Sequence, residues 1–370
     1  MKIERIDLSL FRMNLKTGFE TSFTRISSKE FFVVSVYGEG VIGYGECVAL
    51  PSPMYNEETI GSAWKMVTDF LIPIVLNRQI DHPIEIHDLF ASIRRNYMAK
   101  SALETAIWDL YSKQQGKPLA TVLGGTKPMI DVGVSIGIEP SVNEVLHKVE
   151  QFLSEGYKKI KVKIKPGFDL EPIQQIRKHF GTDIPLMADA NSAYTLAHLD
   201  LLQELDQYQL MMIEQPLAHD DIVDHARLQR VMKTPICLDE SIHSYEDARK
   251  AIELGSCRTI NIKVGRVGGL YESKRIHDLC LEKDIPVWCG GMMESGIGRA
   301  HNIALTSLEN FTIPGDTSAS SRYFEEDIVD PEVSLYAPGV LKVPSEPGIG
   351  YQINTKTWMK FLRKQEVFQS

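Results

Sequence analysis

From about residue 130 onward, short runs of β-branched and other apolar residues alternate with longer stretches whose apolar positions recur at helical spacing. Strands are expected in the ranges 132–137, 159–164, 184–188, 210–214, 235–239, 259–264, 286–290 and 311–314. Ser244 is expected to cap one intervening helix, and Gly255 to end it. Parallel strands need a crossover connection, so these repeated strand–helix units predict a parallel sheet. Eight strands between residues 127 and 325 predict closure into a (β/α) barrel.

Residues 1–126 have a different pattern, which predicts an α+β domain. A strand is expected at 31–37, with a hairpin partner at 41–48. Two helices should follow. Asn56 is the expected cap of the first, and the apolar stripe of the second runs through 103–111.

The alternation of strands and helices does not continue in the last segment, 326–370. Residues 340–343 are apolar enough to form a strand, which we expect to return to the first domain. The expected fold is therefore an α/β protein, with a (β/α) barrel between an N-terminal α+β domain and a C-terminal segment.

An open doubly wound sheet is the alternative to the barrel. Such a sheet usually carries a G-x-G-x-x-G turn after its first strand. Gly133 and Gly137 do not fit that spacing, and the glycine cluster at 265–269 comes late in the chain. The barrel is therefore favoured.

Composition and charge narrow the class of partner. The chain has 370 residues and a net charge of −9, which gives no global attraction for nucleic acid or anionic lipid. The longest apolar run, 70–76, is too short to span a bilayer. The number of cysteines is odd, five, without a C-x-x-C pair, which argues against a disulfide framework or a zinc cluster. A cytoplasmic protein acting on a small molecule is expected.

Charged residues stand at the ends of five consecutive predicted strands. These are Lys163, Asp189, Glu214, Asp239 and Lys263, spaced 26, 25, 25 and 24 positions apart. In barrel enzymes the carboxyl ends of the strands form the active site. Each unit advances one step around the rim, so the order predicts three neighbouring carboxylates with a lysine on either flank.

This set of residue types suits proton transfer next to a carboxylate. Three carboxylates are typical ligands of a hard divalent cation such as Mg²⁺ or Mn²⁺, and a carboxylate substrate could complete the coordination. The cation would stabilise the charge that develops when the α-proton leaves. Lysine is a weak base at its ordinary pKa, but a neighbouring cation lowers that pKa. Lys161 lies on the same strand face as Lys163 and could supply this effect or contact the substrate.

One charged residue at a strand end is more often a cap or a surface charge. Five at near-constant spacing, in an order that fits one mechanism, reverse that expectation. Asn191 and Glu240 also lie near the rim and are expected to support the ligands. His301 belongs to no Ser/His/Asp pattern and is expected to pack structurally.

Several motifs resemble the muconate-lactonizing subgroup of the enolase superfamily. They are Lys161-Val-Lys163, Asp189-Ala-Asn191, Met212-Ile-Glu214-Gln-Pro216, Leu238-Asp239-Glu240-Ser and Ile262-Lys263. Within the subgroup, the closest likeness is to the o-succinylbenzoate synthase / N-succinylamino acid racemase family. That likeness is carried by Gly133-Val-Ser-Ile-Gly137, Met98-Ala-Lys100, Gly265-Arg-Val-Gly-Gly269, Trp288-Cys-Gly-Gly-Met292, Arg299-Ala-His-Asn302 and Pro314-Gly-Asp316.

The resemblance implies an enolase-type barrel, an N-terminal capping domain, a homo-oligomer, and unequal duties for the two lysines. In the synthase reaction, a dehydration in menaquinone biosynthesis, Lys163 would remove the α-proton while Lys263 stays protonated. In racemisation both lysines would exchange protons with the substrate. Arg266 looks like the arginine of the racemising branch and could tune Lys263, although pairing with a surface acid is the alternative.

The family likeness also points to residues that shape the substrate site. These are Phe19 in the loop 17–25, the stretch 50–55, Ser135, and the segment 291–293 with Gly291 and Met292. Gly18 stands before Phe19, where relatives often have proline, so the stiffness of this loop is open.

Four rival functions remain open. A racemase without synthase activity and a muconate cycloisomerase would share the same core. A dipeptide epimerase would need an Asp-x-Asp element after the last strand, but Asp316 is followed by Thr317 and Ser318. A non-catalytic scaffold predicts a broken constellation, whereas all five positions are intact.

Overall fold

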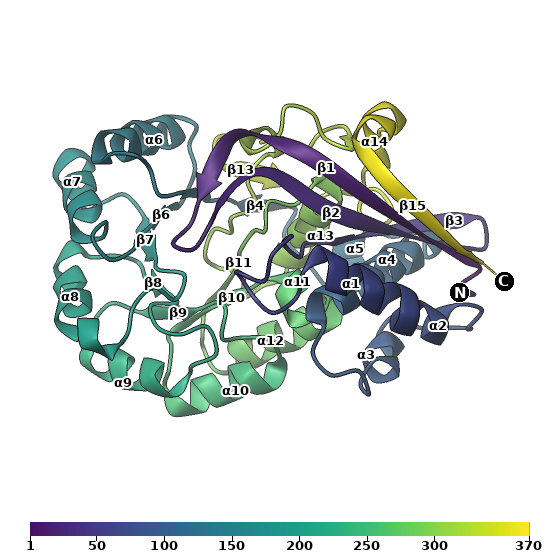
Figure 1. The fold of residues 1–370 in the computed structure, drawn as a ribbon, viewed down its shortest axis with the longest axis horizontal. Helices are drawn as coiled ribbons and strands as arrows, with labels where there is room; N and C mark the ends of the chain where they lie inside the picture. The colour runs from purple at the N-terminus through teal and green to yellow at the C-terminus, as the bar shows by residue number, and fades with distance from the viewer. Residues whose placement is uncertain (370) are drawn as a thin grey trace.

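The N-terminal domain is built on an antiparallel sheet that the C-terminus completes. The computed structural model describes residues 1–369. The sheet contains β1 (Arg5–Glu20), β2 (Arg25–Gly38), β3 (Val41–Cys47) and β15 (Leu362–Gln369), in the order β15-β1-β2-β3. Arg5 pairs with Tyr37 on one side and Gln369 on the other, so the ends of the chain lie together (Figure 1).

The main helix of this domain, α4 (Tyr97–Gln114), packs closely on the sheet. A Cβ atom at Gly43 would lie 2.1 Å from the carbonyl oxygen of Ala106, and one at Gly45 would lie 2.2 Å from that of Ala102. Only glycine permits this approach. Smaller helical elements complete the domain: α1 (Ile60–Met66), the π-helical turn η1 (Val67–Leu71), α2 (Ile72–Val75), α3 (Glu85–Leu89) and α5 (Leu119–Leu123).

The cap of α1 differs from the sequence prediction. Thr59, not Asn56, is the N-cap, and it exchanges side-chain and backbone hydrogen bonds with Ser62 in a capping box. The Asn56 side chain instead accepts from the backbone N–H of Glu58 and closes a local turn.

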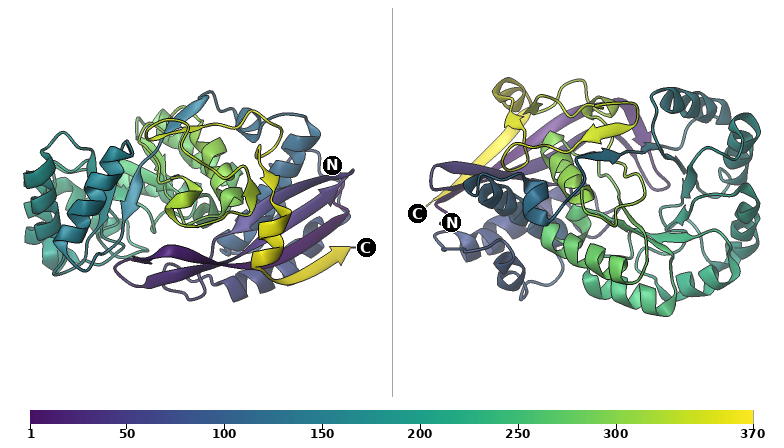
Figure 2. Two further views of the ribbon diagram at one scale, coloured as in Figure 1. Left: turned by 90° about the horizontal axis from the view of Figure 1, so that it is seen from above. Right: turned by 180° about the vertical axis from the view of Figure 1, so that it is seen from behind.

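The second domain is a parallel sheet curved into a barrel, with helices on its outside (Figures 1 and 2). Its strands lie side by side in chain order: β5 (Val134–Ile136), β6 (Ile160–Lys163), β7 (Leu186–Asp189), β8 (Ile213–Glu214), β9 (Ile236–Leu238), β10 (Thr259–Ile262) and β11 (Val287–Cys289). The connecting helices are α6 (Val142–Ser154), α7 (Leu170–Phe180), α8 (Leu199–Glu204), α9 (Val223–Val231), α10 (Tyr245–Leu254), α11 (Val264–Val267), α12 (Leu270–Glu282) and α13 (Gly296–Thr306). Short 3₁₀ turns are η2 (Leu196–His198), η3 (Leu205–Tyr208) and η4 (Ser320–Arg322). The barrel prediction is confirmed, and Ser244 and Gly255 bound α10 as expected.

The expected eighth strand at 311–314 does not form as a regular strand. Isolated bridges close the ring there instead, one joining Phe311 to Val287 and one joining Gly315 to Val132. Pro314 has no N–H to donate, and the N–H of Thr312 turns back to the carbonyl of Asn310. The segment therefore closes the barrel without a continuous ladder.

The C-terminal segment touches both domains. Residues 340–342 form β13 (Val340–Lys342), which pairs with β4 (Met129–Asp131) beside the barrel and not with the N-terminal sheet, so that part of the prediction was wrong. The link to the N-terminal sheet is β15, which follows α14 (Thr355–Phe361). A further pair joins β12 (Val329–Asp330) to β14 (Gln352–Ile353).

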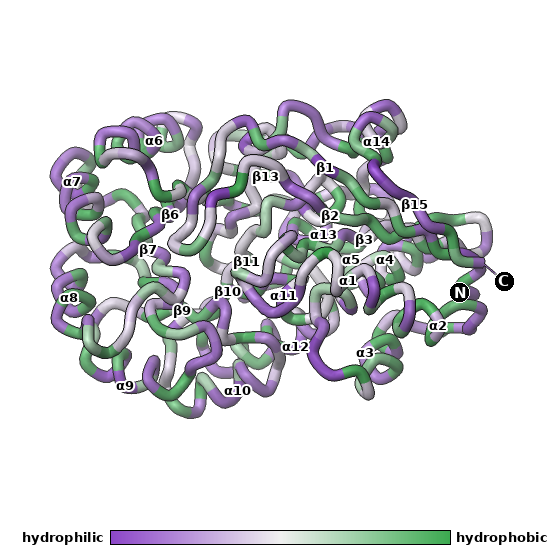
Figure 3. Tube along the Cα trace, in the orientation of Figure 1, coloured by the Kyte–Doolittle hydropathy of each residue, from purple (hydrophilic) through white to green (hydrophobic). Residues whose placement is uncertain are grey.

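Apolar side chains form one large cluster around the barrel and another between the N-terminal sheet and its helices. The outer barrel helices alternate between polar and apolar positions along their length, as amphipathic helices do (Figure 3). Within residues 1–369, no helix is both long enough and apolar enough to cross a membrane.

Candidate active site

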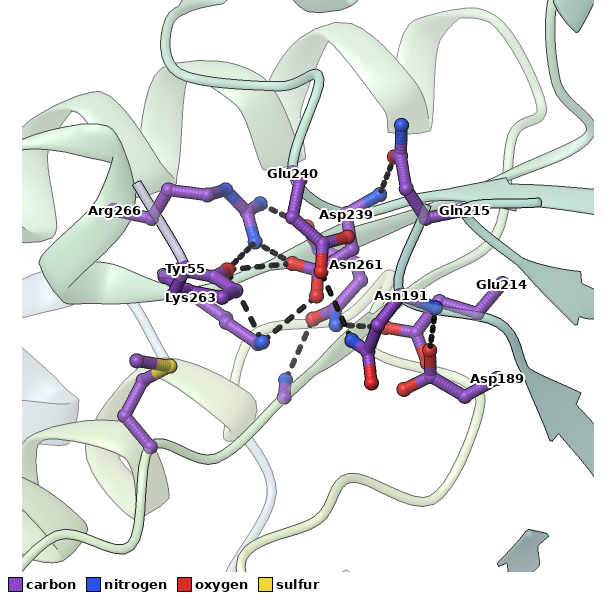
Figure 4. A network of polar contacts seen from close by, with 12 residues as sticks. Tyr55, Asp189, Asn191, Glu214, Gln215, Asp239, Glu240, Asn261, Lys263 and Arg266 are labelled. Atoms are coloured by element: carbon purple, nitrogen blue, oxygen red, sulfur yellow. Dashed lines mark hydrogen bonds and ion pairs between the residues drawn. The ribbon is translucent and has the colours of Figure 1, made fainter. Parts of the chain in front are cut away.

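The five strand-end residues predicted from the sequence meet at one end of the barrel. Lys163 lies directly across from Asp189 in the sheet, and Asp189 directly across from Glu214. Asp239 follows β9, and Lys263 follows β10. All five side chains are buried, with the lysines 6% exposed. Figure 4 shows the three carboxylates and Lys263 in one polar network.

Lys163 lies on a flank made by barrel residues. Its Nζ is 2.5 Å from Asp189 Oδ2 and 2.5 Å from Asn191 Oδ1. Asn191 in turn donates from Nδ2 to Glu240 Oε1 at 2.9 Å. Glu240 therefore reaches the site through Asn191. Burial lowers the pKa of Lys163, with Asp189 opposing this effect and Lys161 adding to it.

Lys161 is surrounded by carboxylates. Its Nζ lies 3.2 Å from Asp189, 3.1 Å from Glu214 and 2.7 Å from Asp316. Burial lowers the pKa of Lys161, but the carboxylates outweigh burial and raise it well above its ordinary value. Lys161 is therefore held as a cation close to Lys163.

Lys263 lies on a flank that the N-terminal domain completes. Its Nζ is 2.8 Å from Asp239 Oδ2 and 3.2 Å from the hydroxyl of Tyr55. Burial lowers the pKa of Lys263, whereas Tyr55 and Glu240 oppose it, and the balance lies above the ordinary value.

Arg266 supports the same flank. Its guanidinium contacts Asp239 and donates to the carbonyls of Ile242 and Asn261. Arg266 is fully buried, so the alternative that it pairs with a surface acid is wrong.

The backbone beside the site is strained at several non-glycine residues. Asn191, Gln215 and Met293 have positive φ values of 41°, 38° and 57°. Such conformations persist only where the surroundings hold them, and they gather at functional sites. Gln215 shows how they are held, because its Oε1 accepts from the backbone N–H of Asp239 at 3.0 Å.

The predicted substrate contacts line a single pocket above the lysines. Phe19, Ser135, Gly291 and Met292 all border it, together with Lys161, Lys163, Lys263 and Tyr55, around a cavity of about 60 Å³. Ser135 is 5% exposed, and its Oγ has no hydrogen-bond partner among residues 1–369. An unpaired buried hydroxyl facing a pocket is available to a ligand.

The loop that carries Phe19 is anchored to the barrel. Ser22 Oγ donates to the carbonyl of Asn191 at 3.1 Å, and the N–H of Ile138 donates to the carbonyl of Glu20 at 2.8 Å. The tip of the β1–β2 hairpin therefore covers the mouth of the barrel (Figure 1).

Two family models match most of the chain. Residues 5–124 match the N-terminal domain of mandelate racemase / muconate lactonizing enzyme, and residues 144–357 match the enolase C-terminal domain-like model. An o-succinylbenzoate synthase from Geobacillus kaustophilus is 56% identical over 100% of this chain and 98% of its own length. This chain belongs to the o-succinylbenzoate synthase / N-succinylamino acid racemase family of the enolase superfamily.

Other members of the superfamily agree in sequence and structure. An N-succinylamino acid racemase from Thermus thermophilus is 48% identical over 95% of both chains. The crystal structure of an enolase-superfamily member from Listeria innocua has a TM-score of 0.96 and 45% identity, and the match covers 100% of this chain and 99% of that one. The chain is an enzyme of this superfamily, whose members use divalent metal ions.

The chemical type of the three carboxylate donors suits a divalent metal. Asp189, Glu214 and Asp239 supply carboxylate oxygens from adjacent strands, the ligands that hard cations prefer. In the described part of the chain, no three His, Cys, Asp or Glu side chains converge as a metal cluster. The carboxylates instead contact Lys161, Lys163, Lys263 and Arg266. These cations balance the negative charge of the carboxylates. Closely spaced carboxylates need such compensation, because they otherwise repel one another and take up protons.

Sequence reasoning missed other residues that hold the site. Asn261 donates to Glu214 Oε1 at 2.6 Å and accepts from the N–H of Gly290 at 2.7 Å. Lys159 lies 3.2 Å from Asp316 and 3.4 Å from the centre of the Trp288 ring. Strand alternation could have found both, because Lys159 lies four positions before Lys163, just ahead of β6, and Asn261 lies two positions before Lys263 on β10, so even spacing puts each on the same face as the catalytic candidate. His301 packs structurally, near the carbonyls of Ile297 and Thr105.

Proposed function

We propose that this enzyme is an o-succinylbenzoate synthase that also racemises N-succinylamino acids. The observation that carries the proposal is the pair of buried lysines on opposite flanks of three carboxylates, at the floor of a pocket. Full-length relatives named for each of the two reactions support it. The synthase would serve menaquinone biosynthesis.

In the dehydration, Lys163 Nζ takes the proton on the carbon next to the substrate carboxylate. It then returns that proton to the hydroxyl that leaves from the same face, so water is released. Lys161 provides a fixed positive charge beside Lys163 and is suited to the substrate carboxylate. Lys263 keeps its proton and stabilises the developing negative charge from the opposite face.

In the racemisation, both lysines change protonation state. One removes the α-proton from its face, and the other delivers a proton to the opposite face. Arg266 and Tyr55 contact Asp239, the partner of Lys263, and so set the charge around the second base. We propose that this surrounding governs how well the enzyme racemises.

We also propose that Asp189, Glu214 and Asp239 bind Mg²⁺, or Mn²⁺ in its place. When bound, the metal would act as a Lewis acid toward the substrate carboxylate. Asn261 and Gln215 already hold Glu214 and the backbone of Asp239. This support for the ligand set is independent of the metal.

Three further proposals concern the localisation, assembly and domain boundaries of the enzyme. We infer a cytoplasmic enzyme, which the buried and unpaired state of every cysteine in the described chain supports. We infer a homo-oligomer by analogy with relatives. We divide the chain into a capping domain (1–126), a barrel (127–325) and a C-terminal segment (326–370).

Parallel assays test the main proposal. The purified enzyme is given Mg²⁺ and either 2-succinyl-6-hydroxy-2,4-cyclohexadiene-1-carboxylate or N-succinyl-phenylalanine, with Lys163→Ala and chelated enzyme as controls. We expect both substrates to react. Turnover of the amino acid alone would identify a racemase without synthase activity. Turnover of L-Ala-L-Glu or muconate in place of both would overturn the proposal.

A further inference from the structure

A buried lysine outside the predicted site joins the two domains at the wall of the pocket. Lys29 lies on β2 and is 1% exposed. Its Nζ donates to the carbonyl of Val48 at 3.1 Å and to the carbonyl of Met292 at 3.0 Å. Val48 belongs to the N-terminal domain, whereas Met292 follows barrel strand β11. One ammonium group thus connects the backbones of both domains.

The Met292 side chain makes a second connection at the same place. Although it comes from the barrel, it packs in the apolar cluster of the N-terminal domain and is 7% exposed. Gly291, Met292 and Met293 all border the substrate pocket. The positive φ of Met293 requires external support, as noted above.

Side chains from separate elements hold this segment at successive positions. The N–H of Gly290 donates to Asn261, and the N–H of Met292 donates to Glu294 Oε1 at 2.8 Å. Lys29 donates to the Met292 carbonyl, and this hydrogen bond comes from the other domain. Without Lys29, the segment would keep its barrel contacts but lose its hydrogen bond to the capping domain.

Burying the charge of Lys29 is unfavourable unless hydrogen bonds compensate for it. The role of this side chain is therefore not limited to filling space. Burial lowers the pKa of Lys29, and the carboxylates of Glu46 and Glu294 oppose that shift. A methionine would fill similar space without the charge. What the ammonium adds is its hydrogen bonds to the two carbonyls.

We propose that Lys29 is a positioning residue for substrate binding, which holds the wall formed by 291–293 against the capping domain through the Met292 carbonyl. The proposal rests on the proposed function. Lys29 is absent from the pocket lining and contacts none of the proposed bases or metal ligands. Its loss should therefore affect binding more than the chemical step.

Lys29→Met and Lys113→Met form a matched pair for the test. Lys113 is partly buried in the N-terminal domain and donates to the carbonyl of Ile42 and to the carboxylate of Asp109, neither of which belongs to the segment 291–293. We expect Lys29→Met to raise KM for both substrates about tenfold while kcat changes less than about threefold, as loss of the charged hydrogen bond to the pocket wall at Met292 predicts. Lys113→Met should leave KM unchanged. Lys29→Gln is made in parallel in case the methionine variant does not fold.

Hydrogen exchange supplies a readout that needs no turnover. Amides of residues 290–293 should exchange faster in the Lys29 variant and at the wild-type rate in Lys113→Met. A folded, active Lys29 variant with unchanged KM would overturn the positioning role and leave the proposed function intact. Wild-type enzyme that converts neither substrate would overturn the proposed function. In that case, unaltered exchange in the Lys29 variant would reject the Lys29 contact separately.

Discussion

The two flanks of the active site use the same residue type at equivalent strand ends, yet they are built differently. Lys163 is held by Asp189 and Asn191, both from the loop end of the neighbouring barrel strand. Lys263 is held by Asp239 and by Tyr55, which comes from the N-terminal domain. The side-chain partners of Lys163 both come from the barrel, whereas Lys263 has one partner from the capping domain and depends on the position of that domain.

This difference separates the two lysines chemically. Burial lowers the pKa of Lys163, whereas Tyr55 and Glu240 offset burial and raise that of Lys263. A dehydration by one base needs only the first flank to accept a proton. A racemisation needs both flanks, so it should be more sensitive to changes around Lys263.

The largest expected effect comes from removing the first flank. Lys163→Ala should lower kcat for both reactions by about 10³-fold or more, because the general base is lost. Steady-state assays of the two substrates measure this. Lys158→Ala, at an exposed lysine just before β6, is the control and should retain full activity. Near-normal dehydration in Lys163→Ala would refute the base assignment.

Removal of Lys263 should abolish α-proton exchange in one enantiomer of the substrate but not in the other. In D₂O, Lys263→Ala should exchange the α-proton of only one enantiomer of an N-succinylamino acid, the one whose proton faces Lys163. Proton NMR of each enantiomer follows the exchange. Loss of exchange in both enantiomers, or its retention in both, would be incompatible with two bases on opposite faces.

Substitutions of the three carboxylates that lie between the two lysines test the proposed metal site. Asp189→Asn, Glu214→Gln and Asp239→Asn should each weaken Mg²⁺ binding by about tenfold or more, because each removes a charged oxygen ligand. Calorimetric titration measures the affinity. Glu240→Gln, which alters a buried carboxylate that contacts Asn191, should have a smaller effect. Equal affinity in the wild type and the three ligand variants would exclude this ligand set.

The two flanks also differ in how far the sequence predicts them. Lys163, its neighbours and Lys263 follow from strand-end spacing, because each βα unit advances one step around the barrel. Tyr55 lies in a loop of another domain and carries no periodic signal. The stretch 50–55 was marked through the family likeness, but the hydrogen bond of Tyr55 to Asp239 required the folded arrangement.

The fold also shows that periodic patterns are predictable from the sequence, whereas contacts between distant segments are not. The barrel strands were predicted because their apolar runs repeat. The strands β1 and β15 were missed, because β15 is largely polar and forms by pairing with a strand at the other end of the chain. The irregular closure at 311–315 depends on Pro314 and on bridges to two different strands, which local propensity does not encode.

The smallest expected effect tests whether the capping domain contributes to the second flank. Tyr55→Phe keeps the ring but removes the hydroxyl that contacts Asp239, Lys263 and Arg266. We expect racemisation kcat to fall about three- to tenfold, as loss of a buried hydrogen bond predicts, with dehydration reduced less. Tyr44→Phe, in the N-terminal domain outside the pocket lining, controls for removing a tyrosine hydroxyl. If Tyr55→Phe slowed both reactions equally, the hydroxyl would serve the whole site, and the second flank would be no more dependent on the capping domain than the first.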